Sequence, residues 1–219
     1  MEFVSEVINA YLKKLVERYN HNNTTRAFAV DSFEITRIWE GKKPKIKIVP
    51  QLYKFILGVV NQAHHWMLVV ILPAQKKSLF LDPLGENKKA VGHCKDVTRS
   101  LMRQRGLNPS RWECETNTHS IQQDATSCGA FALKFAECIL NGLPLVFDTS
   151  PSSVNSIREE IAVSLLMNTD DLTDLCRICG ENTGDTLWIG CDKCLRWFHK
   201  ICAKYPKNGR RSYVCEACK

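Results

Sequence analysis

The stretch CRICGENTGDTLWIGCDKCLRWFHKICAKYPKNGRRSYVCEAC, residues 176–218, determines the structure of the C-terminal part of the chain. It holds three Cys-x-x-Cys pairs and one His-x-x-Cys pair, formed by Cys176, Cys179, Cys191, Cys194, His199, Cys202, Cys215 and Cys218. Pairs at these spacings are typical ligands of structural zinc, which takes four ligands in a tetrahedron. Eight ligands suffice for two closed zinc sites. So small a domain buries too little apolar surface to fold alone, so we expect the two Zn²⁺ ions to supply much of its stability.

The distribution of cysteine divides the chain at the same place. Seven of the 11 cysteines lie after residue 175, and the other four are scattered without regular spacing. No charged and then apolar leader follows Met1, and no apolar run approaches the roughly 20 residues that span a bilayer. We therefore predict an intracellular, reducing environment and no membrane partner.

The net charge at first invites a nucleic-acid partner. The formal charge is +7 with every thiol counted as neutral. Seven zinc-bound thiolates and two Zn²⁺ ions would lower it to about +4, a mild excess common in soluble proteins. The charge therefore does not indicate direct binding of nucleic acid.

Hydrophobic periodicity indicates an α+β domain over residues 1–168, followed by a short polar linker at 169–175 and the zinc finger at 176–219. Apolar residues at helical spacing predict helices over 4–19, 128–141 and 154–166, and Gly142 is expected to end the second of them. Residues 85–110 are charged and are expected to be partly helical. Strands are predicted for four runs rich in Val, Ile and Phe: KIKIVP (45–50), FILGVV (55–60), WMLVVILP (66–73) and SLFLDPL (78–84). Several of these runs are apolar on both faces, as central strands are.

Cys128 stands where a thiol becomes a nucleophile. It opens a long apolar helix, whose free backbone N–H groups and dipole favour the thiolate. A thiolate needs a base and an acid that orients the base. His65 heads one predicted strand and Asp82 ends the next, so antiparallel pairing would bring the two side chains together. Gln122, six residues before the cysteine, could donate an amide hydrogen to an oxyanion.

Two of these assignments have a rival in the adjacent residue. His64 is as near in sequence as His65, but neighbouring strand residues face opposite sides, so only one of them can reach Cys128. Gln123 competes with Gln122 in the same way. The remaining histidines of the first domain, His21, His93 and His119, are expected at the surface.

The set His65-Trp66, fifteen intervening residues, Asp82-Pro83-Leu84, Gln122 and Cys128-Gly129 resembles the catalytic set of the Ulp/sentrin-specific peptidase family. The resemblance covers roughly residues 4–167 and includes EVINAYL (6–12) and SIREEIAVSLL (156–166). It implies a papain-like cysteine peptidase fold with a central mixed sheet and flanking helices. It also implies roles for single residues. Cys128 is the nucleophile, His65 rather than His64 the base, Asp82 its orienter and Gln122 rather than Gln123 the oxyanion donor, while Trp66 lines a tunnel for the Gly-Gly tail of a modifier.

Two positions depart from the pattern of that family. Where its members usually have Trp-Leu-x-Asp before the opening helix, this chain has Phe3, Val4 and Ser5. Where they commonly have Asp immediately before the nucleophile, this chain has Ser127, with Asp124 three positions earlier. The four core residues are all present, so the resemblance implies an intact catalytic centre.

The C-terminal ligand order, together with WFHKIC (197–202), resembles that of PHD fingers. Their cross-braced arrangement implies that one zinc is bound by Cys176, Cys179, His199 and Cys202 and the other by Cys191, Cys194, Cys215 and Cys218. PHD fingers commonly read histone tails. The resemblance implies that Trp197, with Trp188 as a second wall, forms a cage for methylated lysine. The alternative is that both indoles only cover the small core.

The resemblance to the Ulp/sentrin-specific family implies a peptidase that cleaves after the C-terminal Gly-Gly of a ubiquitin-like modifier, SUMO-type in the first place and Nedd-type in the second. The finger would direct it to chromatin, which places it in the nucleus or, failing that, the cytoplasm. Two other functions stay open. The chain could be a catalytically idle binder of such a modifier, or a processing peptidase of a viral or transposon polyprotein.

Overall fold

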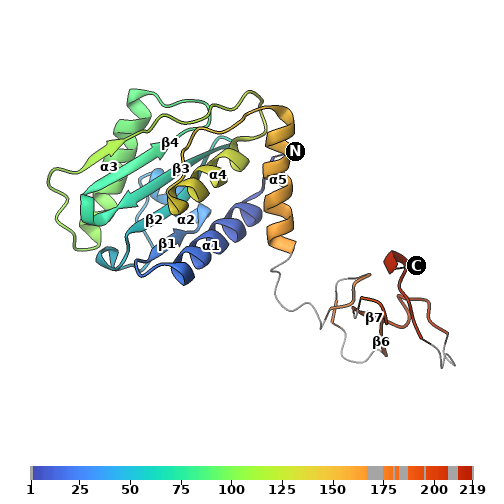
Figure 1. Ribbon diagram of the computed structural model, residues 1–219. Helices are drawn as coiled ribbons and strands as arrows, with labels where there is room; N and C mark the ends of the chain where they lie inside the picture. Colours follow the sequence, from blue (N-terminus) through green and yellow to red (C-terminus); the bar gives the residue numbers. More distant parts are fainter. Residues whose placement is uncertain are drawn as a thin grey trace. The chain divides into compact units, whose positions relative to one another are not determined.

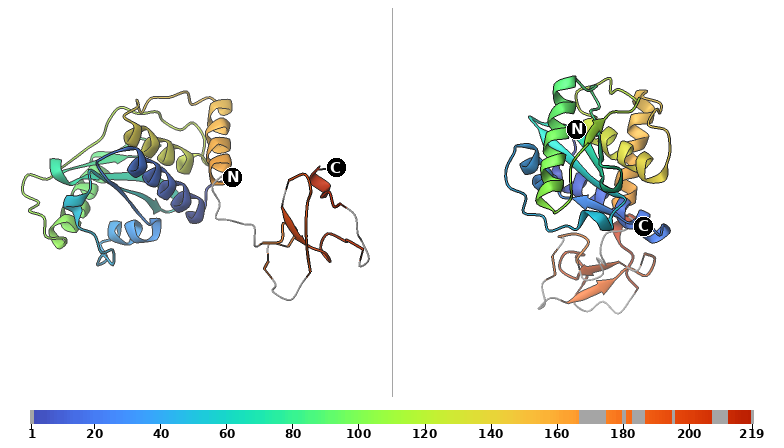
Figure 2. Two further views of the ribbon diagram at one scale, coloured as in Figure 1. Left: turned by 60° about the horizontal axis from the view of Figure 1, so that its bottom comes forward. Right: turned by 90° about the vertical axis from the view of Figure 1, so that its left-hand side faces the viewer.

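The computed structural model describes residues 2–166, 175–179, 181–182, 187–194, 196–206 and 212–218. The chain forms two compact units, Met1–Leu165 and Leu166–Lys219 (Figures 1 and 2). Of the linker expected at residues 169–175, all but Leu175 lies outside the described residues. Among the described helices, none is both long and apolar enough to cross a bilayer.

A mixed sheet forms the centre of the first unit. Its strands follow chain order: β1 (Ala27–Val30), β2 (Phe55–Gln62), β3 (His65–Leu72), β4 (Lys77–Leu81) and β5 (Glu113–Glu115). The three central strands pair antiparallel, and each edge strand pairs parallel to its neighbour. The predicted α+β class with a central mixed sheet is therefore confirmed.

Helices cover both faces of this sheet, as Figure 1 shows. On one face lie α1 (Ser5–Asn22), α4 (Cys128–Asn141) and α5 (Pro151–Leu166), and on the other lie α2 (Ser32–Trp39) and α3 (Lys88–Gln104). Alternate residues of β2 and β3 point to opposite faces, so Leu57 and Leu68 pack against the first group and Ile56 and Val69 against the second. The central strands are thus buried on both sides, as their sequence indicated.

The prediction of a strand at KIKIVP is wrong. Lys45–Val49 form no regular element, and a 3-10 turn follows at Pro50–Leu52. The carboxylate of Glu34 accepts hydrogens from the backbone of Lys45 and Ile46, so no neighbouring strand is needed to satisfy them. Ile46 and Ile48 still pack against the core, which explains the strand-like alternation of this loop.

The turn between β2 and β3 positions the first residue of β3. Ala63 and His64 both have positive φ, 51° and 63°, as a two-residue hairpin loop requires. Gln62 pairs with His65 directly across this turn. The register therefore places His65 at the end of the sheet, beside the end of β4. A second 3-10 turn, Pro73–Gln75, connects β3 and β4.

The second unit is small and rich in ligand residues. An antiparallel ribbon pairs β6 (Trp188–Gly190) with β7 (Trp197–His199), and a 3-10 turn spans Glu216–Cys218. In the described part of this unit, the buried apolar residues are Cys176, Cys191, Phe198 and Cys215. Phe198 is the single member of that set that is not a cysteine, so this core is too small to hold the unit together without metal.

Candidate active site and metal centres

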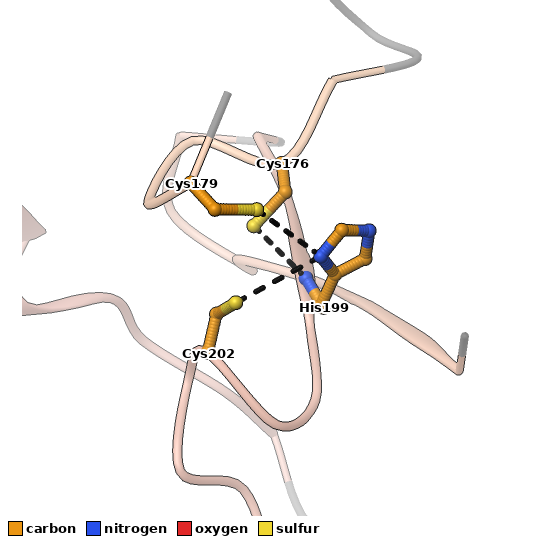
Figure 3. A group of neighbouring side chains, drawn as sticks. All are labelled: Cys176, Cys179, His199 and Cys202. Atoms are coloured by element: carbon orange, nitrogen blue, oxygen red, sulfur yellow. Dashed lines mark hydrogen bonds between the residues drawn. The ribbon is translucent and has the colours of Figure 1, made fainter. Parts of the chain in front are cut away.

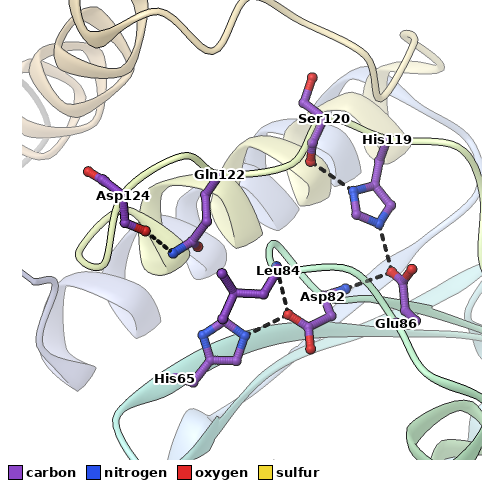
Figure 4. Close-up of polar contacts among 8 residues, drawn as sticks. All are labelled: His65, Asp82, Leu84, Glu86, His119, Ser120, Gln122 and Asp124. Atoms are coloured by element: carbon purple, nitrogen blue, oxygen red, sulfur yellow. Dashed lines mark hydrogen bonds and ion pairs between the residues drawn. The ribbon is translucent and has the colours of Figure 1, made fainter.

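His65 and Asp82 form the polar centre of the first unit (Figure 4). The Nε2 atom of His65 lies 2.6 Å from Oδ1 of Asp82, and the same oxygen accepts a hydrogen from the backbone N–H of Leu84 at 2.9 Å. Both side chains are mostly buried, with 22% and 14% of their areas exposed. Since Nε2 is engaged by the carboxylate, Nδ1 of the imidazole is left for another partner.

That partner is Cys128, the first residue of α4. Hydrogen bonding to Asp82 and to Cys128 raises the pKa of His65 from 6.5 to about 9, against the lowering effect of burial. The imidazole is therefore protonated at neutral pH, beside a thiol at the positive end of a helix. The Cys128 sulfur thus lies beside a cation and a helix N-terminus, where it can act as a nucleophile.

Gln122 lies in the segment that precedes α4. Its side chain is buried, and its Nε2 donates to the backbone carbonyl of Asp124 at 2.7 Å, which leaves one amide hydrogen free for another acceptor. The adjacent rivals point elsewhere. Gln123 and His64 are both exposed, and Gln123 donates to the carbonyl of Ile121. The structure thus brings His65, Asp82 and Cys128 together, and the Gln122 segment is joined to the Asp82 turn through the Gln122 N–H, which donates to the Pro83 carbonyl at 2.9 Å.

Trp66 connects the N-terminal segment to this site. Its side chain is only 3% exposed, and its Nε1 donates to the carbonyl of Phe3 at 3.1 Å. It borders a cavity of about 590 Å³ that is also lined by Ser32 and Phe33. A separate cavity of about 520 Å³ opens beside His65 and Asp82. Trp66 therefore lies next to His65 in β3 but lines a different cavity from the one beside His65 and Asp82.

Gly129 explains why a glycine follows the candidate nucleophile. A Cβ at this position would lie 3.1 Å from Cβ of Phe3 and 3.2 Å from Cδ1 of Ile8. Such contacts are tighter than packed side chains allow without displacement. The absence of a side chain lets the N-terminal segment pack directly on the start of α4.

Ser127, which stands where the resembling family commonly has Asp, is held by a network of its own. Its hydroxyl donates to Oδ2 of Asp124 at 2.7 Å, and its N–H donates to Oδ1 of the same residue at 3.0 Å. Arg158 from α5 donates to the Ser127 hydroxyl at 3.1 Å and to the Thr126 carbonyl at 2.8 Å. Asp124 thus supplies a carboxylate to this loop from three positions earlier, and the loop that precedes Cys128 stays anchored.

The finger contains two clusters of metal ligands. One consists of Cys176, Cys179, His199 and Cys202 (Figure 3), and the other consists of Cys191, Cys194, Cys215 and Cys218. In each cluster the ligand atoms all lie within 4.8 Å of one another. Within the described residues these are the groups that could hold a metal ion, and they reproduce the two sets expected from the resemblance.

The distances fit tetrahedral zinc. Zinc–sulfur bonds of about 2.3 Å give a tetrahedron with ligand atoms about 3.8 Å apart. The sulfurs of Cys194 and Cys215 lie 3.8 Å apart, and Nδ1 of His199 lies 3.3 Å from Sγ of Cys179 and 3.8 Å from Sγ of Cys202. A hydrogen bond from the backbone N–H of Cys215 helps to lower the pKa of Cys191 to about 6, which favours the thiolate that zinc binds.

Trp188 and Trp197 lie on one face of the β6–β7 ribbon. Trp188 is opposite His199 and Gly190 is opposite Trp197, so both indoles project to the same side. Trp188 is half-buried, with its ring centroid 4.2 Å from that of His199, whereas 44% of Trp197 is exposed. Gly190 has no side chain to fill the space beside Trp197.

The prediction that His119 lies at the surface is wrong. Only 3% of its side chain is exposed, and its Nε2 lies 2.7 Å from Oε1 of Glu86. Glu86 in turn accepts a hydrogen from the backbone N–H of Asp82 at 2.8 Å. No local pattern marks His119 in the sequence, because its partner is 33 residues away.

Comparisons with known proteins agree with this geometry. The family model described as Ulp1 protease family, C-terminal catalytic domain, matches residues 2–171. Sentrin-specific protease 2 of Rattus norvegicus is 26% identical over 158 residues, which cover 65% of this chain and 26% of that protein. The chain therefore spans about a quarter of the length of the curated relatives that it matches in this domain.

Solved structures show the same fold. The C-terminal Ulp1 protease domain in complex with Smt3, the yeast ortholog of SUMO, superposes with a TM-score of 0.62 at 17% identity, covering 76% of each chain. A SUMO protease Ulp1 with its catalytic cysteine oxidised to a sulfinic acid gives a TM-score of 0.58 at 18% identity, covering 76% of this chain and 78% of that one.

The finger has relatives of its own. The PHD-finger model matches residues 176–218. PHD finger protein ALFIN-LIKE 1 of Oryza sativa subsp. indica is 37% identical over 68 residues, which cover 29% of this chain and 26% of that protein.

Proposed function

This chain belongs to the Ulp1 protease family, and on that premise we propose that it cleaves after the C-terminal Gly-Gly of a ubiquitin-like modifier, SUMO-type before Nedd-type. The observation that carries the proposal is the connected set of Cys128, His65 and Asp82, with 2.6 Å between Nε2 of His65 and the carboxylate. A SUMO-type substrate is supported by a neighbour solved with Smt3 and by relatives named sentrin-specific proteases.

The proposed reaction follows from these contacts. The thiolate of Cys128 attacks the carbonyl carbon of the terminal glycine, and its electron pair forms the new C–S bond. The free amide hydrogen of Gln122 and the backbone N–H groups at the start of α4 stabilise the oxyanion. As the C–N bond breaks, the His65 imidazolium gives its Nδ1 proton to the leaving amine, and a thioester remains. Water, deprotonated by the same nitrogen, attacks the thioester; the C–S bond breaks, and the glycine carboxylate, the Cys128 thiolate and the imidazolium result.

A panel of modifiers tests this proposal. The full chain is mixed with SUMO, a Nedd-type modifier and ubiquitin, each carrying a fluorogenic amide on its C-terminal glycine, with Cys128→Ser as the blank. We expect SUMO to give the highest kcat/KM. Binding of a modifier without cleavage would instead favour the idle binder. Equal cleavage of a short Gly-Gly peptide would favour a polyprotein peptidase, which needs no folded modifier.

We propose further that the finger reads a histone tail with a methylated lysine, which would place the protein in the nucleus. The support is the ribbon face described above, where Trp188 and Trp197 flank Gly190. Residues in this diagonal relation lie about 7–8 Å apart, within reach of aromatic side chains. Because Trp188 is fixed against His199, this wall would need little reorganisation to bind a ligand.

Trp197→Ala separates the cage from a purely structural role. With 44% of Trp197 exposed, we expect zinc content and melting temperature to change little. Affinity for a trimethylated tail peptide should fall about 2- to 30-fold, the value of one cation–π contact, with no change for the unmodified peptide. Ile201→Ala is the matched control, since Ile201 is 81% exposed on the same finger.

Two results would count against the cage. One is equal affinity of the wild-type finger for both peptides. The other is a loss of stability in Trp197→Ala of about 3–5 kcal/mol, as expected for a large aromatic residue removed from a core.

A further inference from the structure

A second histidine–carboxylate pair, His119 and Glu86, lies beside the candidate catalytic pair (Figure 4). Glu86 follows the turn that carries Asp82, and His119 lies in the segment that leads to Gln122. Their side chains are 10% and 3% exposed, and Nε2 of His119 lies 2.7 Å from Oε1 of Glu86. The proposed reaction assigns no step to either residue.

The contacts of His119 determine its protonation. Nδ1 lies 2.8 Å from the backbone carbonyl of Ser120, and a carbonyl oxygen can only accept a hydrogen. Nε2 faces the Glu86 carboxylate, which also accepts. Both ring nitrogens therefore carry hydrogen, and the pair is an imidazolium with a carboxylate. Burial alone lowers the pKa of His119, but the hydrogen bonds to Glu86 and Ser120 outweigh it and raise that pKa overall.

Glu86 links His119 to the main chain of Asp82. The same Oε1 atom accepts the Asp82 N–H at 2.8 Å. The following turn is closed by the N–H of Gly85, which donates to the Asp82 carbonyl at 2.8 Å and has a φ of 93° that favours glycine. The backbone of Asp82 is therefore held on both sides, by a carboxylate and by a turn.

His119 also connects this turn to the Gln122 segment and to α4. The N–H of Gln122 donates to the carbonyl of Pro83 at 2.9 Å, a second link between the two segments. The His119 ring lies with its edge toward Phe135 of α4, at a centroid distance of 4.9 Å. One imidazolium thus touches the Asp82 turn, the Gln122 segment and the helix that begins at Cys128.

We infer that Glu86 and His119 are positioning residues that hold the Asp82 carboxylate in line with His65 and keep the Gln122 segment against the same turn. The inference rests on the proposed peptidase function. Neither residue touches the reacting atoms. Asp82 and Glu86 are the titratable groups that act on His119 among the described residues, and Phe135 and the Ser120 backbone, which also contact it, do not titrate.

The test uses variants of the full chain with SUMO carrying a C-terminal fluorogenic amide. Glu86→Ala is expected to lower kcat about 10- to 100-fold with little change in KM, because it misplaces Asp82 without altering the modifier surface. Glu86→Gln should retain most activity, since its amide oxygen still accepts the Asp82 N–H. His119→Ala, which leaves Glu86 unsupported, should lower kcat by less than Glu86→Ala does.

Glu34→Ala is the matched control. Glu34 likewise accepts a loop N–H, that of Ile46 at 2.9 Å, and pairs with a cation, Arg37, but it has no contact with Asp82. We expect its loss to affect thermal stability and leave kcat near wild type.

A second readout needs no substrate. The His65 ring is titrated by NMR in each variant. The pKa of about 9 reflects the hydrogen bond to Asp82 first, so a displaced carboxylate should lower it. Because the imidazolium is lost as pH rises through that pKa, the alkaline limb of kcat should move to lower pH in Glu86→Ala. General destabilisation would scale the rate equally at every pH.

The outcomes are distinct. Wild-type kcat and an unchanged His65 titration in Glu86→Ala and His119→Ala would overturn the inference. So would a loss of rate no larger than that of Glu34→Ala with the titration unchanged. If Glu86→Ala does not fold, His119→Ala decides by the same two readouts. Should the wild type cleave no modifier at all, the proposed function fails, while the His65 titration still tests the positioning role.

Discussion

Cys128→Ser is expected to lower hydrolysis of the fluorogenic modifier by about 10⁴- to 10⁶-fold, the range seen when a peptidase loses its nucleophile or base. A serine hydroxyl is far less acidic than a thiol, so the His65 imidazolium cannot hold it ionised. Modifier binding should remain, because the docking surface is untouched. Fluorogenic hydrolysis assays and binding isotherms on the same protein preparation measure the rate of hydrolysis and the affinity for the modifier.

Cys138→Ser is the matched control. Cys138 lies on the same helix and is as buried as Cys128, at 3% against 2% exposed, but it is ten residues away from the helix start. It should reduce stability and leave turnover near wild type. Equal loss in both variants would show that the effect of Cys128→Ser comes from packing.

His65→Ala should reduce turnover to a similar degree, and the double variant should be little worse than either single one, because nucleophile and base act as a unit. His64→Ala should have little effect, since His64 is exposed in the hairpin turn with φ of 63°. A large loss from His64→Ala together with none from His65→Ala would reverse the assignment.

Removal of zinc is expected to unfold the finger entirely. Structural zinc contributes about 10–16 kcal/mol to such domains, and Phe198 is the one buried apolar side chain besides cysteine in the described part of the finger. Chelation should therefore abolish finger structure and release two zinc ions per chain, as measured by metal analysis and near-UV circular dichroism.

The first unit supplies the control for this experiment. Its core is built from packed strands and helices, and among the described residues the groups that could hold a metal all lie in the finger. Removal of residues 170–219 should eliminate zinc and leave hydrolysis measurable. One zinc per chain, or a metal retained by residues 1–169, would contradict the two-cluster assignment.

Sequence patterns predict best those elements that depend on residues close together in the chain. The strands β2, β3 and β4 are apolar on both faces, and α4 has both a start signal and a glycine end at Gly142, which adopts φ of 66°. Because His65 and Asp82 lie at the ends of adjacent antiparallel strands, their meeting also follows from the chain order.

Elements held by distant partners escaped prediction. β5 is only Glu113–Glu115, and α2 spans eight residues, so neither carries enough periodic signal. The loop at Lys45–Val49 resembles a strand because one side packs on the core, while a remote carboxylate satisfies its N–H groups. His119 is buried by Glu86 and Phe135, and neither contact is visible in the residues around it.

The most direct measurement of the central claim is to treat the full chain with SUMO bearing a C-terminal electrophile and to map the adduct by peptide mass spectrometry. One modifier per chain, attached to Cys128 and absent from Cys128→Ser, is the expected result. An adduct on Cys94, Cys114 or Cys138, or labelling that persists in Cys128→Ser, would contradict the account.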